Sequence, residues 1–159
     1  MAYPSDGDPI SLQIMDYVRA RLLTIQTPNY FTDVAGAELW ETSHSFDSLV
    51  HPFVFIIPLT DDASPFPVEC RRRRQMLLQL LLQTTFIPGS DDWKDPLFKF
   101  RTDVVHAFDT DIQLGGLCEF VQATQANVYD ADQTNGVAEA VVNLSISYRH
   151  LNDNPSLTN

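Results

Sequence analysis

The most constraining feature of the sequence is a block of four arginines, Arg71–Arg74, that runs directly into a leucine-rich segment. Along that segment purely apolar positions alternate with mixed ones: Met76, Leu78, Leu80 and Leu82 alternate with Leu77, Gln79, Leu81 and Gln83. A repeat of two residues is typical of a strand, in which successive side chains point to opposite faces. We therefore expect a long strand over residues 70–83, whose arginine-rich end lies outside an apolar core and reaches solvent or a partner.

Two other segments predict helices. Apolar residues recur at helical spacing over residues 10–25 and again over residues 97–112. An Asp-Pro pair precedes each stripe, Asp8-Pro9 in the first case and Asp95-Pro96 in the second, and we expect these pairs to begin the helices. Gly115-Gly116 is expected to end the second helix, because glycine readily adopts the left-handed conformation found there.

Four further segments predict strands, at residues 39–41, 53–57, 117–129 and 137–148. Asn135-Gly136 indicates a hairpin between the last two, and residues 60–67 are expected to form an acidic loop. The resulting order, α-β-β-β-α-β-β, predicts an α+β fold: a single domain with a largely antiparallel, mixed sheet and two main helices packed on it. We expect this domain to span residues 1–150, and residues 151–159 to form a flexible C-terminal tail.

The charge balance excludes several classes of protein. Ten Lys and Arg against 21 Asp and Glu give a net charge of -11 over 159 residues, which argues against a protein that grips nucleic acid or an anionic membrane. Two cysteines are too few for a disulfide-rich scaffold or a four-cysteine zinc site. With neither a signal-peptide pattern nor an apolar stretch of membrane-spanning length, we expect a soluble protein from a reducing compartment.

The sequence contains no recognisable catalytic, nucleotide-binding or metal-binding motif. Cys70 and Cys118 have no local base beside them, as a catalytic thiol would need. The four histidines show no metal-ligand spacing: His44, His51, His106 and His150. We therefore expect no catalytic residue, no metal site and no cofactor, and hence a protein that is not an enzyme. A competing enzyme hypothesis requires His44 or His51 to meet a loop carboxylate in a closed pocket.

Aspartates occur in pairs at four places: Asp61-Asp62, Asp91-Asp92, Asp109 and Asp111, and Asp130 and Asp132 before the Asn-Gly turn. Paired carboxylates can bind a divalent ion or act as acid and base. None of these groups has the spacing of a calcium-binding loop, however, and loop aspartates commonly initiate turns. We favour turn and surface roles for them.

The arginine block has three competing interpretations: contact with DNA phosphate, pairing with acidic loops of a neighbouring copy, or a solvated strand end. Four strand residues span only about 13 Å, which is a small patch for an independent DNA-binding protein of this net charge. A basic patch on an otherwise acidic subunit suits head-to-tail association, in which unlike patches attract across a heterologous interface and can close a ring. We favour this second interpretation.

Several segments follow one another in a recognisable order. Residues 112–117 (Ile-Gln-Leu-Gly-Gly-Leu) end a predicted helix and lead, through a strand and an acidic turn, to a closing strand that ends in Tyr148-Arg149. The first helix leads into residues 27–36 (Thr-Pro-Asn-Tyr-Phe-Thr-Asp-Val-Ala-Gly). In this order and spacing, over about residues 9–150, the chain resembles the tail terminator proteins of long-tailed bacteriophages, also called tail completion or minor tail protein U-like proteins.

This resemblance implies a structural virion protein, assembled in the host cytoplasm, that forms a homo-hexameric ring on the tail tube. The ring would stop tube polymerisation and present the surface that docks onto the head connector. DNA would pass through its lumen without specific binding, and no enzyme activity, cofactor or membrane would be involved. The alternative of the same structural class is another neck component, such as a head-completion or connector-adaptor protein.

Two groups of residues are candidates within such a ring. The subunit-interface candidates are Arg71, Arg72, Arg73 and Arg74. An acidic lumen would repel DNA and let it slide, and its candidate residues are Asp61, Asp62, Asp130 and Asp132.

Overall fold

The leucine-rich segment forms the central strand of a five-stranded sheet, as its alternation predicts. In the computed structural model, which describes residues 9–40, 49–63 and 71–151, this strand is β3 (Arg71–Thr85). The strand order is β1-β2-β3-β5-β4, so β3 pairs with a neighbour on each side. Both neighbours run antiparallel to β3, and the pairing with β5 extends over its full length.

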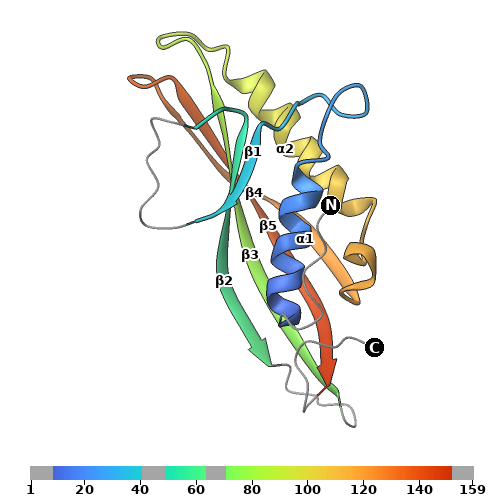
Figure 1. The fold of residues 1–159 in the computed structure, drawn as a ribbon. Coiled ribbons are helices and arrows are strands. Elements are labelled where there is room, and N and C mark those ends of the chain that lie inside the picture. Colours follow the sequence, from blue (N-terminus) through green and yellow to red (C-terminus); the bar gives the residue numbers. More distant parts are fainter. Residues whose placement is uncertain (1–8, 41–48, 64–70, 152–159) are drawn as a thin grey trace.

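The order of elements confirms the predicted α-β-β-β-α-β-β arrangement and the α+β fold (Figure 1). Only the short β1 runs parallel to its neighbour β2, which makes the sheet mixed but largely antiparallel. The elements beside β3 are α1 (Ile10–Leu22), β1 (Gly36–Leu39), β2 (Phe53–Ala63), α2 (Lys94–Asp109), the 3-10 turn η2 (Leu114–Gly116), β4 (Phe120–Asp132) and β5 (Val137–Leu151).

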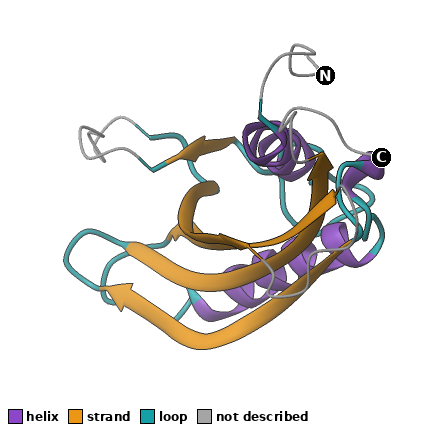
Figure 2. Cartoon of the chain, turned by 90° about the horizontal axis from the view of Figure 1, so that it is seen from below, coloured by secondary structure: helices purple, strands orange, loops and turns teal. Residues whose placement is uncertain are grey.

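Both helices contribute to one core on a single face of the sheet. Met76, Leu78, Leu80 and Leu82 are at most 2% exposed, and they share this core with alternate residues of β2 and β5. The buried stripes of the helices are Ile10, Ile14, Val18 and Leu22 in α1 and Leu97, Phe100, Val104 and Phe108 in α2. The sheet is strongly curved (Figure 2), and the ends of β2, β3 and β5 project beyond α1 (Figure 1).

The helix ends differ from the prediction. Trp93 is the N-cap of α2 and no side chain caps it, so Asp95 and Pro96 lie inside the first turn. The helix already ends at Asp109, and Ile112 beyond it is 53% exposed. Gly115-Gly116 therefore does not end α2; it belongs to the separate turn η2, where both glycines have positive φ.

The first helix also differs at both ends. Its N-cap is Pro9, with no capping side chain, and Asp8 lies outside the described residues. The helix ends at Leu22 instead of Ile25, which is nevertheless buried after the last turn.

Strand boundaries shift as well. Residues 60–63, predicted as loop, continue β2 beyond a bulge between Pro58 and Thr60. The first strand covers residues 36–39 and not 39–41, and β4 covers 120–132 and not 117–129. Leu151, predicted to begin the tail, still pairs with Arg71, and residues 152–159 lie outside the described residues.

The predicted hairpin between β4 and β5 is confirmed, and Gly136 fixes it against the chain that follows β3. Its carbonyl oxygen accepts a hydrogen bond from the Phe86 amide at 2.8 Å, and its φ is +66°. A Cβ at this position would collide with the Phe86 carbonyl oxygen, so glycine is required.

Replacing Leu80 by Ala should cost about 2–5 kcal/mol of unfolding free energy, because it opens a cavity in the core between sheet and helices. Leu81→Ala is the matched control: Leu81 is half-buried on the opposite face, and its loss should be about 1 kcal/mol. Urea unfolding of the two variants measures both values. Equal losses of unfolding free energy in the two variants would contradict the assignment of Leu80 to the core face of β3 and of Leu81 to the opposite face.

Candidate functional site

The two ends of the sheet carry opposite charge. Because β3 and β5 are antiparallel, the arginine block lies beside the end of β5, with Arg73 opposite Arg149 and Arg74 opposite Tyr148. We call Arg71–Arg74 and Arg149 the arginine end. The other end of β3 lies beside the β4–β5 hairpin, and a strand of this length separates the two ends by roughly 45 Å.

A single carboxylate holds two guanidinium groups at the arginine end. Arg73 Nε lies 3.0 Å from Glu119 Oε2, and Arg149 forms an ion pair with the other oxygen of Glu119. The hydroxyl of Ser147 also donates to Glu119, at 3.3 Å. Two positive charges on one negative charge leave this cluster net positive.

A second network lies on the opposite face of the same strands. Arg74 Nε is 3.1 Å from Asp61 Oδ1, and the Tyr148 hydroxyl donates to Asp61 Oδ2 at 2.8 Å. The bulge between Pro58 and Thr60 shifts the alternation of β2 by one residue, so that Asp61 pairs with Met76 and shares its face. Burial of the phenol, followed by its hydrogen bond to Asp61, raises the pKa of Tyr148.

These networks show where the interface and lumen candidates lie. Arg73 and Arg74 each have a carboxylate partner within their own chain. Arg71 and Arg72 belong to the end of β3, but their side chains lie outside the described part of the structure. Asp61 belongs to the intrachain network with Arg74, and its neighbour Asp62 is exposed.

Carboxylates gather at the far end, around the hairpin. Asp130 pairs in register with Glu139, and Asp132 with Val137. Asp132 accepts hydrogen bonds from Asn135 Nδ2 at 2.7 Å and from two backbone amides, and these bonds, led by that of Asn135, lower its pKa. We call Asp33, Asp95, Asp130, Asp132 and Glu139 the acidic end, since all five line cavities near the end of β3.

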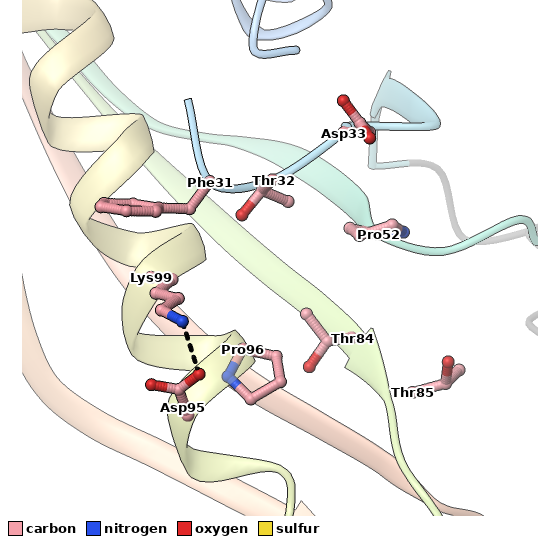
Figure 3. Close-up of a pocket in the computed structure, with 9 residues that line it drawn as sticks. All are labelled: Phe31, Thr32, Asp33, Pro52, Thr84, Thr85, Asp95, Pro96 and Lys99. Carbon is pink, nitrogen blue, oxygen red and sulfur yellow. Dashed lines mark ion pairs between the residues drawn. The ribbon is translucent and has the colours of Figure 1, made fainter. Parts of the chain in front are cut away.

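The first cavity has a volume of about 420 Å³ and lies between the loop before β1, the first turn of α2 and the end of β3 (Figure 3). Two carboxylates, one ammonium and several threonine hydroxyls surround it. Asp95 forms an ion pair with Lys99 at 2.8 Å, and Asp33 accepts the Thr27 amide at 2.7 Å. Thr84 is 4% exposed, and its Oγ1 is buried without a hydrogen-bond partner among the described residues.

The second cavity, of about 630 Å³, tests the enzyme hypothesis at His51. His51 Nε2 lies 3.4 Å from Gln83 Oε1, and Gln83 Nε2 in turn donates to Glu139 at 2.7 Å. The side-chain amide of Gln83 therefore lies between the His51 imidazole and the Glu139 carboxylate. The direct contact between histidine and carboxylate that the enzyme hypothesis requires is not formed between these two residues. His44 lies outside the described residues.

The other candidate nucleophile and ligands are dispersed. Cys118 is buried, and burial, followed by the charges of Asp111 and Glu119, raises its pKa to about 12, so its thiol stays protonated at neutral pH. His106 is exposed on α2 and packs edge-on against Tyr30. Within the described ranges no three His, Cys, Asp or Glu side chains converge as metal ligands. Cys70 and the side chain of His150 lie outside them.

The two segments on which the resemblance rests, residues 27–36 and 112–117, lie at contacts between the α1 and α2 regions. The Tyr17 hydroxyl of α1 donates to Asp111 at 2.7 Å, and its ring lies against Gly115, where a Cβ would come within 2.8 Å. In the loop after α1, the Thr32 amide donates to the buried Asp103 of α2 at 2.8 Å.

Sequence reasoning missed Asp103 and Glu119. A signal for Asp103 exists: it stands three residues after Phe100 on the apolar stripe of α2, where a buried carboxylate needs a partner.

Comparison with models of known protein families finds none that matches the chain, and comparison with curated proteins finds no match either. No helix in the described ranges is long and apolar enough to cross a membrane.

Tyr148→Phe should change how stability depends on alkaline pH. The raised pKa of Tyr148 means that the folded state favours the neutral phenol, so its contribution persists below about pH 10 and is lost as the pH rises further. At neutral pH the variant should lose about 1–3 kcal/mol, because the hydrogen bond to Asp61 is gone. Above pH 10 the gap to the wild type should narrow in urea unfolding.

Tyr129→Phe is the matched control, because Tyr129 is 52% exposed. It should keep the wild-type dependence on pH. Parallel curves for the wild type and Tyr148→Phe would contradict the role given to the buried phenol.

Proposed function

We propose that this protein is a structural virion protein: a ring-forming tail terminator that caps the tail tube of a long-tailed bacteriophage. The observation that carries the proposal is the separation of charge along β3, with the arginine end at one extremity and the acidic end at the other. The resemblance in sequence supports it, because the helix, the Leu-Gly-Gly turn and the hairpin that carries Tyr148-Arg149 follow one another along the chain in that order.

Opposite charge at opposite ends favours head-to-tail association. Such an interface is heterologous, since the surface that one subunit offers differs from the one it receives, and it closes into a ring when the rotation between subunits allows it. Electrostatic complementarity guides the encounter and fixes which ends meet. The proposed assembly is a hexamer of this chain, with the tail tube protein on one side and the head connector on the other.

The net charge suits a channel for DNA. Six copies would carry six times the net charge of -11, and like charge keeps the phosphate backbone from adhering. In this proposal the exposed Asp62 is the strongest lumen candidate, because the other exposed candidates, Asp130 and Asp132, belong to the acidic end that meets the neighbouring subunit. Asp61 is the weakest candidate, because Arg74 and Tyr148 already bind its carboxylate.

Deleting this protein from a phage that encodes it should give overlong tails or tails without heads, because nothing would stop tube growth or join the head. Electron microscopy of the particles measures tail length and attachment, and complementation with the wild-type gene is the control. Tails of normal length joined to heads would contradict the proposed function.

Arg71→Gln with Arg72→Gln should weaken ring formation and leave unfolding unchanged, with the larger effect at low salt, where exposed charges are least screened. Arg73→Gln with Arg74→Gln is the matched comparison, since it removes equal charge but also breaks the intrachain pairs with Glu119 and Asp61. That variant should unfold more easily. Native mass spectrometry measures ring formation, and urea unfolding measures stability. If the first variant formed rings like the wild type, the arginine block would be interpreted as a solvated strand end and not as an interface.

A further inference from the structure

The cavity beside Thr84 has the chemistry of a receptor for a positively charged, planar donor group. Two carboxylates, Asp33 and Asp95, stand at its margin. Asp95 pairs with Lys99 (Figure 3), and the oxygens of Asp33 accept hydrogen bonds from Thr27. The ammonium of Lys99 neutralises only part of their charge. The cavity therefore keeps a net negative charge and selects for a cation.

Thr84 adds an observation that does not depend on these charges. A buried hydroxyl normally forms a hydrogen bond, and one left without a partner costs free energy. The Thr84 hydroxyl has none among the described residues, and Thr84 is one of the residues that line the cavity. A donor or acceptor that enters the cavity would satisfy it after a rotation of the side chain.

The walls favour a guanidinium over an ammonium. Pro52, Pro96 and Phe31 provide flat apolar surfaces; Phe31 is 67% exposed, and the Lys99 ammonium lies 5.7 Å from its ring centroid. A guanidinium is planar, weakly hydrated and able to stack on such surfaces while its five N–H groups reach several acceptors. A lysine ammonium is strongly hydrated and offers no flat face.

The chain itself contains guanidinium groups in the Arg71–Arg74 block, but this block lies at the opposite end of β3 from the cavity. Thr84 is the penultimate residue of β3 and the arginine block is its beginning, roughly 45 Å away along an extended strand. Arg71–Arg74 therefore cannot reach the cavity of their own chain. The same groups on a second copy, placed head to tail, can.

We propose that this cavity receives an arginine of the Arg71–Arg74 block from a neighbouring copy of the chain. This inference rests on the proposed self-association and specifies which groups of two neighbouring copies are in contact. The second cavity is a poorer receptor, because none of the described residues that line it has a buried polar side-chain atom without a hydrogen-bond partner.

The test uses a hexapeptide with the sequence of residues 71–76, acetylated and amidated, titrated into the full chain at a concentration where it is monomeric. The peptide should shift the amide NMR signals of Thr84, Thr85 and Lys99. Asp33→Asn with Asp95→Asn should weaken binding by at least about fivefold, as loss of exposed ion pairs would. Thr84→Val should weaken it by about threefold, as loss of one hydrogen bond would.

Asp91→Asn with Asp92→Asn is the charge-matched control, since both residues are exposed and lie outside the cavity lining. It should leave binding within twofold of the wild type. Shifts centred on residues 130–139, an equal loss in the control, or no saturable binding would each overturn the inference.

Ring assembly separates this inference from the proposed function. If rings form and the Asp33→Asn, Asp95→Asn variant assembles like the wild type, the inference fails and the function stands. If the peptide binds at Thr84 but phages lacking the protein have normal tails joined to heads, the function fails and the receptor site stands. Restored assembly of Asp95→Lys by Arg72→Glu, with neither variant assembling alone, would support the pairing.

Discussion

The antiparallel pairing of β3 with β5 is the interaction on which the rest of the structure depends. It runs in continuous register from Arg71 opposite Leu151 to Thr85 opposite Val137. One face of this ladder supplies the leucines and valines against which both helices pack. The same register brings the arginine block beside Arg149 and the end of β3 beside the acidic hairpin. The core, the arginine end and the hairpin part of the acidic end thus depend on one set of backbone hydrogen bonds.

The alternation in the leucine-rich segment was enough to predict the central strand, because each face of β3 lies in a different environment. The element order followed from similar periodicities. The helix ends could not be predicted in the same way, since tertiary contacts decide them: Asp111 accepts the Tyr17 hydroxyl and the Gly115 amide, and this draws the chain out of α2 before the glycines. Local sequence signals predict the boundaries of an element less well than they predict its existence and type.

For the candidate site, too, the sequence predicted some features and missed others that depend on tertiary contacts. The sequence identified the charged groups but not their partners, because a bulge in β2 brings Asp61 to Arg74 and a tight turn brings Glu119 to Arg73. Pro58 inside a predicted strand was the available signal for the bulge, since proline in a strand commonly marks one. Nothing local marks Thr84, whose unpartnered hydroxyl becomes apparent only once α2 and the loop before β1 lie over the strand.

The continuous ladder also makes β3 a rigid spacer. In the proposed ring, the surface that gives an arginine and the surface that receives one lie at the two ends of the same strand. The distance between successive contacts is then set by the number of residues in that strand and not by a flexible linker. Ring diameter would accordingly be encoded in strand length, and insertion of a residue pair into both β3 and β5 would preserve the facing of every side chain while lengthening the repeat of the assembly.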